Sequence, residues 1–125
     1  MPHIIVVDDE DDVREFLRRA FHRYAPHAEI SAVADGPAAL DLIRTHGCDL
    51  LITDHRMPGM TGAELLRALR EQGLDCPIIV ISADASAEAA AIDAGATAFF
   101  YKPLTTTQIR ALIQTWLAPP EGSAP

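Results

Sequence analysis

Residues 50–62 read LLITDHRMPGMTG, and this stretch decides the fold. The apolar run at its start is typical of a buried strand, and the strand ends in a single carboxylate, Asp54. A loop rich in proline and glycine follows, which predicts a sharp turn before the next helix. A carboxylate at that point lies at the rim of a fold, where it can meet a ligand. Asp54 is therefore the first candidate functional residue.

Short apolar runs and helical patterns alternate along the rest of the chain. The β-branched run at 4–7 has no polar alternation, which is typical of a strand covered on both faces. The predicted strands are 4–7, 29–33, 50–54, 78–81 and 98–101, and the predicted helices are 13–24, 36–45, 62–73, 85–94 and 105–117. This alternation predicts an α/β fold, in which right-handed crossovers join a parallel sheet with helices on both of its faces.

The helical segments differ in how firmly their patterns anchor them. Capping-box patterns at 61–64 and 105–108 mark two helix starts. Phe16 and Trp116 fall on the apolar stripes of the first and last helices and are expected to be buried. The alanine-rich fourth helix has Ile92 as its one large apolar residue, so we expect it to be weakly anchored.

Composition limits the classes of function. The chain has 125 residues, 49% of them apolar, which predicts one domain with a real core, expected at 1–118, and a proline-rich tail or linker at 119–125. The net charge of −8 disfavours direct binding to DNA or anionic lipid and favours protein partners. No apolar run is long enough to span a bilayer, and the start lacks a leader pattern, so we expect a cytoplasmic protein.

Both cysteines, Cys48 and Cys76, stand two residues before an apolar run. They are therefore expected at strand starts on the same edge of one sheet, where the thiols come close if the strands are neighbours. In a reducing compartment we interpret them as two small buried hydrophobic residues rather than as a disulfide.

Polar residues gather where the predicted strands end. These residues are Asp8 and Asp9, Asp54, Ser82, and Lys102. Binding sites of open parallel sheets form at this edge. Two carboxylates about 4 Å apart repel by roughly 4 kcal/mol at an effective dielectric constant of 20, so the acids require protons or a cation. Oxygen ligands without histidine or cysteine nearby favour Mg²⁺.

The cation and the hydroxyl complete a site for phosphoryl chemistry. The ammonium group of Lys102 can reach a phosphoryl oxygen, while Ser82 supplies a hydroxyl and Ala83 a backbone N–H. A metal ion on one side of Asp54 and the ammonium group on the other favour transfer of a phosphoryl group onto the carboxylate. No general base is needed, because a carboxylate is already ionised at neutral pH.

Taken together, these motifs resemble one known family over residues 4–117. The motifs are Asp8-Asp9-Glu10, Asp54 with 57–62, Ser82-Ala83, Gly95-Ala96 and Lys102-Pro103. In this order and at these spacings they are similar to the receiver domains of two-component response regulators. The resemblance implies a flavodoxin-like receiver fold with strand order 2-1-3-4-5 and a cis Lys102-Pro103 bond.

The resemblance also implies a role for each matching residue. Asp54 would be the phospho-acceptor, supplied by a histidine kinase or a histidine phosphotransfer protein. The implied Mg²⁺ ligands are Asp9, Asp54 and the backbone carbonyl of Arg56, with Asp8 acting through a water. Lys102 would pair with the phosphoryl group, and Ser82 and Phe99 would be the switch residues. Phe99 stands where the family often has tyrosine, and Ser82 replaces the commoner threonine.

The predicted function is a phosphorylation-dependent signalling switch rather than a turnover enzyme on an external substrate. A downstream protein would bind the face made by 85–94, 98–101 and 105–117, and a phosphorylation-dependent dimer is compatible with the resemblance. One alternative is a magnesium-dependent phosphatase with an aspartyl nucleophile, although Arg56 occupies the place of its usual second acid. The other alternative is an interaction module that needs no phosphate.

One hypothesis is specific to this sequence. Arg56 lies two residues after Asp54, and Asp84 lies two residues after Ser82. We expect both side chains to flank the entrance of the site, where a pair between them would hinder attack of water on an acyl phosphate. The alternative is two solvated charges, because exposed ion pairs contribute little.

Overall fold

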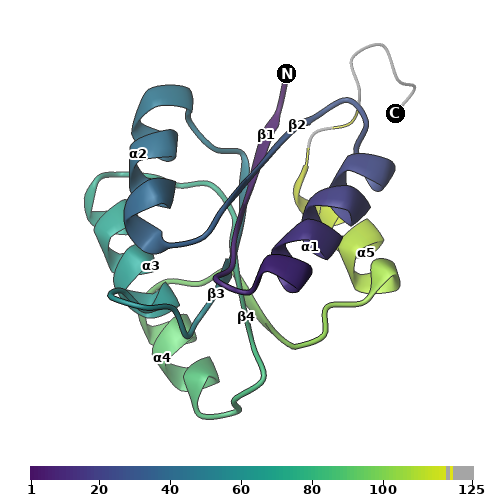
Figure 1. Cartoon of the computed structure of the whole chain (residues 1–125). Coiled ribbons are helices and arrows are strands. Elements are labelled where there is room, and N and C mark those ends of the chain that lie inside the picture. Colours follow the sequence, from purple (N-terminus) through teal and green to yellow (C-terminus); the bar gives the residue numbers. More distant parts are fainter. Residues whose placement is uncertain (118, 120–125) are drawn as a thin grey trace.

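The buried runs of the sequence form a central parallel sheet. The computed structural model describes residues 1–117 and 119, and in it the sheet lies between two layers of helices (Figure 1). The strands are β1 His3–Val7, β2 Glu29–Val33, β3 Leu50–Asp54, β4 Ile78–Ser82 and β5 Ala98–Tyr101. The helices are α1 Asp11–Tyr24, α2 Gly36–His46, α3 Gly62–Glu71, α4 Ala87–Asp93 and α5 Thr106–Trp116.

Side-chain alternation within β1 explains why an uninterrupted apolar run was needed. Ile4 and Val6 pack into the cluster shared with α1 and α5. Ile5 and Val7 pack into the cluster on the opposite face, with residues of α2 and α3. Each face of the strand is therefore covered, as the pattern predicted.

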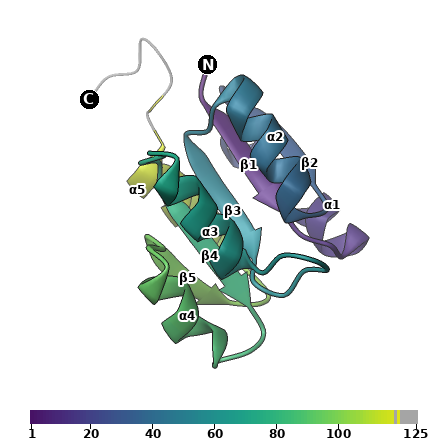
Figure 2. The same ribbon diagram turned by 90° about the vertical axis from the view of Figure 1, so that its left-hand side faces the viewer.

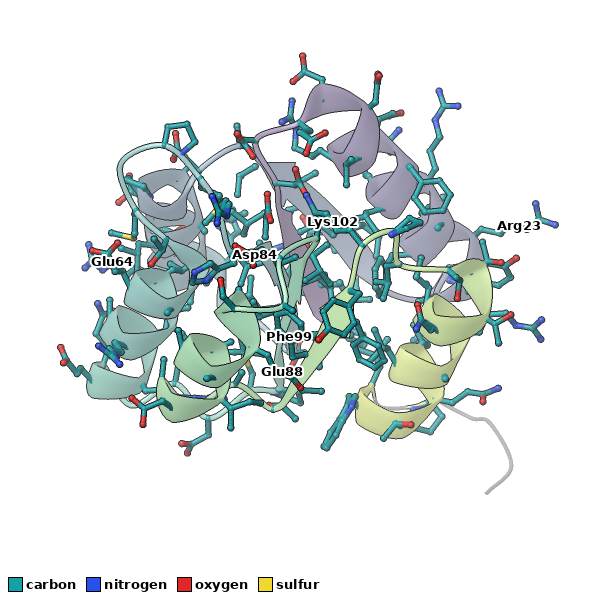
Figure 3. The ribbon with its side chains drawn as sticks, turned by 90° about the horizontal axis from the view of Figure 1, so that it is seen from below. Arg23, Glu64, Asp84, Glu88, Phe99 and Lys102 are labelled. Carbon is teal, nitrogen blue, oxygen red and sulfur yellow. The ribbon has the colours of Figure 1, made fainter. Side chains whose placement is uncertain are left out.

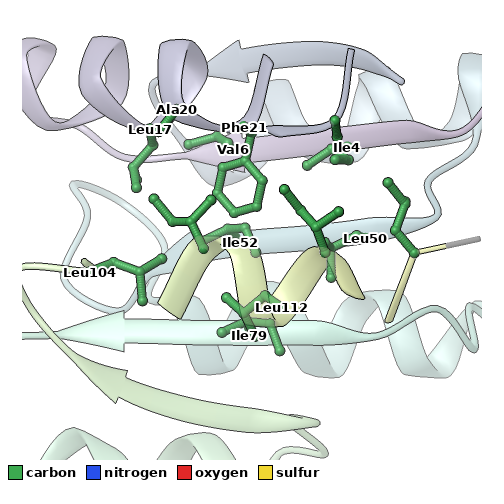
Figure 4. Close-up of a cluster of buried hydrophobic side chains, with 14 of the residues drawn as sticks. Ile4, Val6, Leu17, Ala20, Phe21, Leu50, Ile52, Ile79, Leu104 and Leu112 are labelled. Carbon is green, nitrogen blue, oxygen red and sulfur yellow. The ribbon is translucent and has the colours of Figure 1, made fainter. Parts of the chain in front are cut away.

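The two faces of the sheet are covered by different numbers of helices. Helices α2, α3 and α4 lie in front of the sheet in Figure 2, and α1 and α5 cover its other face. On the α1 and α5 side, Phe21 is the largest fully buried side chain and packs with Leu17, Leu104 and Leu112 against the strands (Figure 4). Burial of large aliphatic and aromatic side chains, each contributing about 1.5–3 kcal/mol, holds both layers on the sheet.

The strand order is β2-β1-β3-β4-β5, with every neighbouring pair parallel. This confirms the order that the resemblance implied. The order places β3 beside β1, with Val7 in register with Thr53. The residues that directly follow these positions, Asp8 and Asp54, therefore emerge at the same edge of the sheet.

Helix starts follow the capping chemistry of the sequence. The capping boxes at Thr61 and Thr105 are both formed, with side chain and backbone bonded reciprocally. Helix α4 is shorter than predicted, because the Asp84 carboxylate accepts hydrogen bonds from both the amide and the hydroxyl of Ser86 and holds a turn there. This turn delays the helix to Ala87.

Two large apolar residues are more exposed than their helical patterns predicted, because Phe16 is 45% exposed and Trp116 is 40% exposed. Ile92, on the helix expected to be weakly anchored, is 50% exposed. Periodicity identifies the side of a helix that faces its neighbour but not where that neighbour ends. Phe16 lies at the rim of a groove that Pro103 and Leu104 also line. Helix α4 buries only Ala87 and Ala91, so small side chains anchor it.

The tail predicted for 119–125 lies outside the described residues, apart from Pro119. Within the described part of the chain, no helix has the length and apolar character needed to cross a membrane.

Candidate functional site

Asp54 ends β3 and lies at the carboxyl edge of the sheet, the edge that Figure 3 views from below. Its side chain is almost buried, because the residue is only 4% exposed. The next amide, of His55, still bonds to the carbonyl of Ile81 on β4 at 3.1 Å, so the strand pairing continues past the acid. The carboxylate is therefore held by a rigid strand end rather than by a mobile loop.

Lys102 is the cation of the site and follows β5 directly. Its Nζ lies 3.1 Å from Asp54 Oδ2 and 3.0 Å from Asp8 Oδ2. Its amide donates to the carbonyl of Ser82 at 3.0 Å, which fixes the start of the side chain next to β4. The Lys102-Pro103 peptide bond is cis, as the resemblance implied. One ammonium group thus bridges two carboxylates from neighbouring strands.

The acids after β1 lie at different depths. Asp8 is fully buried; its Oδ1 accepts a hydrogen bond from the Glu10 amide at 2.9 Å, and its Oδ2 pairs with Lys102 Nζ at 3.0 Å. Carboxylate oxygens of Asp8, Glu10 and Asp54 lie within 4.8 Å of one another. Asp9 is exposed and lines the same pocket. The structure therefore brings Glu10 into the acidic cluster, a residue that the sequence-based ligand set did not include.

Burial and charge change the proton affinities in this cluster. Burial, and then the charge of Asp8, raise the pKa of Asp54 to about 6 from an ordinary 3.8, although Lys102 opposes the shift. Burial lowers the pKa of Lys102, but its bonds to Asp8 and Asp54 outweigh that effect and the net direction is upward. Lys102 therefore remains charged at neutral pH, and Asp54 holds its negative charge at a free-energy cost.

The loop after Asp54 packs directly on the end of β3. The Gly62 amide donates to the carbonyl of His55 at 2.7 Å. A Cβ atom at position 62 would lie 2.6 Å from the backbone oxygen of Asp54, so only glycine allows this approach. The glycine that opens α3 thereby seats the helix against the candidate acceptor.

Ser82, Arg56 and Asp84 line the same pocket from the side of β4 and the loop after β3. Ser82 is buried, and its Oγ accepts a hydrogen bond from the Asp84 amide at 3.1 Å. Arg56 and Asp84 form an ion pair, which confirms the expected contact between them. Hydrogen bonds from Ser86, and then from Arg56, lower the pKa of Asp84 to about 2. A charged bridge therefore lies beside the acidic cluster.

Phe99 lies on β5, outside the acidic cluster, and is half-buried. Its ring meets the edge of the Tyr101 ring at 5.3 Å between centroids. The Tyr101 hydroxyl donates to Glu88 of α4 at 3.3 Å. The two aromatic residues thus connect β5 with α4 on the surface beside the site.

Sequence comparison decides the family. A family model described as the response regulator receiver domain matches residues 4–114. The chain belongs to the response regulator receiver domain family. The receiver domain identity agrees with the site, in which an aspartate at the end of β3 faces a lysine after β5 and acids after β1.

Named relatives support the same assignment. The receiver domain is 38% identical to response regulator MprA of Mycobacterium sp. (strain KMS), over 95% of this chain and 53% of that protein. It is also 38% identical to response regulator MprA of Mycobacterium bovis (strain BCG / Pasteur 1173P2), over 97% of this chain and 54% of that protein. The chain thus spans about half the length of these curated relatives.

Solved structures agree with the receiver fold. The signal receiver domain of the putative response regulator NarL from Mycobacterium tuberculosis is 33% identical, with a TM-score of 0.81 over 90% of this chain and 93% of that one. Vibrio cholerae chemotaxis protein CheY4 is 26% identical, with a TM-score of 0.84 over 94% of this chain and 99% of that one. The chain is therefore the response regulator receiver domain of a two-component system.

Proposed function

We propose that Asp54 accepts a phosphoryl group from a phosphohistidine donor, either a histidine kinase or a histidine phosphotransfer protein. The observation that carries this proposal is the contact of the nearly buried Asp54 carboxylate with Lys102 Nζ at 3.1 Å. In the transfer, the P–N bond to the donor imidazole breaks and a P–O bond to Asp54 forms. The unit that performs this reaction is the domain predicted at 1–118.

Each side chain of the pocket has a defined task in that transfer. With a pKa of about 6, roughly nine tenths of Asp54 is ionised at pH 7, so the nucleophile needs no base. The ammonium group of Lys102 shifts from two carboxylates to the oxygens of the arriving phosphoryl group. The Ser82 hydroxyl and the Ala83 amide, both at the pocket wall, donate hydrogen bonds to the same oxygens.

The acidic cluster fits a divalent cation. Asp8 is fully buried, its only charged contact among the described residues is the Lys102 ammonium group, and the candidate ligand atoms of the cluster are all carboxylate oxygens, as Mg²⁺ prefers. We propose that Asp54, Asp9 and the carbonyl of Arg56 hold Mg²⁺ directly, with Asp8 bound through a water. Glu10 lies close enough to contribute. The ion would supply charge neutralisation of the phosphoryl oxygens.

The signal would leave through the surface of α4, β5 and α5. A phosphate on Asp54 adds up to two negative charges and draws the Ser82 hydroxyl toward it. Phe99, half-buried on β5, then turns into the space that is freed, and its contact with Tyr101 changes. Because α4 buries only alanines, a small free energy suffices to shift it. A downstream protein, or a second copy of the domain, reads the altered surface.

The proposal is tested by the mass of the intact protein after treatment with acetyl phosphate. With Mg²⁺ present, we expect an increase of about 80 Da, one phosphoryl group. With a chelator in place of Mg²⁺, we expect no increase. A protein that stays unmodified in both conditions, yet is folded, would instead fit an interaction module that needs no phosphate.

The Arg56–Asp84 ion pair is expected to lengthen the life of the acyl phosphate. The pair lies at the rim of the pocket and restricts the approach of water to Asp54. In Arg56→Ala and in Asp84→Ala, we expect the phosphoryl group to be lost severalfold faster, measured as release of inorganic phosphate after the donor is removed.

A matched control for this measurement is Arg67→Ala. Arg67 pairs with Asp93 at 3.2 Å, also between exposed side chains, but away from the pocket. Its decay rate should equal that of the wild type. If the decay rates of Arg56→Ala and Asp84→Ala also match the wild type, the pair does not protect the phosphate.

A further inference from the structure

Two cysteines meet at the edge of the sheet opposite Asp54. Cys48 lies just before β3 and Cys76 just before β4, and these strands are adjacent, with Leu51 in register with Ile78 (Figure 2). This register places Cys76 opposite Asp49, so the two cysteines are diagonal neighbours. With strands about 4.8 Å apart and a rise of about 3.3 Å per residue, their Cα atoms lie roughly 6 Å apart, within the range of about 4.4–6.8 Å that a disulfide requires. Both thiols are free in this structure. The topology thus brings together two cysteines that are 28 positions apart, 48 and 76 in the numbering.

The immediate surroundings leave both thiols partly accessible. Each cysteine is half-buried and packs against the hydrophobic cluster of the α2 and α3 face. The amide of Leu51 donates to the carbonyl of Pro77 at 3.0 Å, so the backbones are already hydrogen-bonded beside the two side chains. A bond between the sulfur atoms would therefore join backbones that are held in place.

The two thiols are chemically unequal. The hydrogen bond from Cys48 lowers the pKa of Cys76, and the same hydrogen bond, together with burial, raises the pKa of Cys48. Burial opposes the first shift, and the guanidinium of Arg70 supports it, against the charges of Asp49 and Asp75. Cys76 is therefore the more readily ionised thiol of the pair.

Arg70 is held beside Cys76 by three backbone carbonyls. Its Nη1 donates to Leu74 at 2.7 Å and to Cys76 at 2.9 Å, and its Nη2 donates to Gly95 at 3.1 Å. These bonds fix a positive charge from α3 at the start of β4. The positive charge that favours ionisation of Cys76 is thus held in place by the backbone of the fold.

We propose that Cys48 and Cys76 form a redox-active dithiol that small-molecule disulfides, of the glutathione disulfide class, convert to an intramolecular disulfide. The Cys76 thiolate attacks one sulfur of the small disulfide, forms a mixed disulfide and releases one thiolate, which takes up a proton. Cys48 then loses its proton and attacks the Cys76 sulfur, releasing the second small thiol. The dithiol loses two protons and two electrons, and the small disulfide gains them as it becomes two thiols.

The experiment treats the reduced chain with oxidised glutathione and measures intact mass under denaturing, acid-quenched conditions. The wild type is expected to lose about 2 Da and to carry no glutathione at the end of the reaction. Cys48→Ser is expected to retain one glutathione on Cys76, because no second thiol can displace it. Cys76→Ser is expected to react severalfold more slowly than Cys48→Ser, because burial raises the pKa of its remaining thiol, Cys48.

A second pair of variants tests the hydrogen bond itself. Cys48→Ser keeps a donor to the Cys76 thiolate and Cys48→Ala removes it, so iodoacetamide is expected to alkylate Cys76 severalfold more slowly in Cys48→Ala at pH 7. Thermal unfolding of each variant reports whether it is folded. A wild type that ends with two bound glutathiones, with only intermolecular disulfides, or with both thiols unreacted would overturn the proposal.

Discussion

The Asp54→Asn variant is expected to take up no phosphoryl group from acetyl phosphate in the presence of Mg²⁺. The amide nitrogen and oxygen are poor nucleophiles, and Asp8, the other carboxylate in close contact with the Lys102 ammonium group, is fully buried. Intact mass measures the result. The control is Asp93→Asn, which removes an exposed carboxylate of α4 and should be phosphorylated like the wild type.

If the Asp54→Asn protein is phosphorylated, the acceptor is another residue, and Asp8 and Glu10 are the next acids of the cluster to consider. Mapping the modified peptide would then identify the true acceptor. The same variant also gives a prediction that is independent of phosphate, because it removes a negative charge whose burial lowers the stability of the folded state.

Without divalent cations, Asp54→Asn is expected to be more stable than the wild type above pH 6. The folded state raises the pKa of Asp54 to about 6 from 3.8, so the folded protein holds this proton more tightly than the unfolded chain does. Stability from this group is complete below about pH 3.8 and is lost as the pH rises through about 6. The loss amounts to about 3 kcal/mol, which the asparagine avoids.

Urea unfolding of both proteins between pH 3.5 and 8, roughly the range of the transition, measures this difference. The difference in unfolding free energy should be near zero at the acid end and should rise to a plateau above pH 6, while other groups cancel because both proteins share them. Mg²⁺ should stabilise the wild type and have much less effect on Asp54→Asn. A difference that does not change with pH would contradict the raised pKa.

Replacement of Lys102 by alanine is expected to slow phosphorylation of Asp54 by about 10²–10³. The lysine is the one ammonium group that contacts Asp8 and Asp54, and it is 14% exposed, so solvent provides little substitute for its charge. The rate of phosphoryl uptake from acetyl phosphate at saturating Mg²⁺ measures the effect. Lys102→Arg, which keeps the charge on a wider head group, should give an intermediate rate.

A measurement of Mg²⁺ affinity distinguishes this electrostatic role of Lys102 from a loss of folding in the variant. Removal of the ammonium group leaves the carboxylates of the cluster without their cation, so Lys102→Ala should bind Mg²⁺ more tightly than the wild type. An unfolded variant would bind it more weakly. A Lys102→Ala protein that is phosphorylated within about threefold of the wild-type rate would show that the transfer does not depend on this charge.

The layout of the sheet could be predicted from sequence because its signals are local. Uninterrupted apolar runs identified the strands, and the capping boxes at Thr61 and Thr105 fixed two helix starts. Exposure could not be predicted in the same way. Phe16 and Trp116 lie on apolar stripes, yet each extends past the neighbour that should cover it, and that boundary depends on packing between distant segments.

The site could be predicted by residue type but not in full geometry. Asp8, Asp54 and Lys102 were expected to converge, and they do. The amide of Glu10 donates to the Asp8 carboxylate and turns the chain, so Glu10 joins the cluster. No pattern in the sequence predicted this local conformation. The Arg70 bonds to the carbonyls of Cys76 and Gly95 also gave no signal, because an arginine that donates to backbone atoms has no partner residue to recognise.

The absence of a side chain at position 62 limits how the domain can respond. Because the first turn of α3 sits directly on the carbonyl of Asp54, a shift of α3 would carry the acceptor with it. The leucines of α3, Leu65, Leu66 and Leu69, are buried and resist such a shift. Helix α4, held by two alanines, has no comparable restraint. Motion that begins at the Asp54 carboxylate is therefore directed to α4, while α3 stays fixed against the sheet.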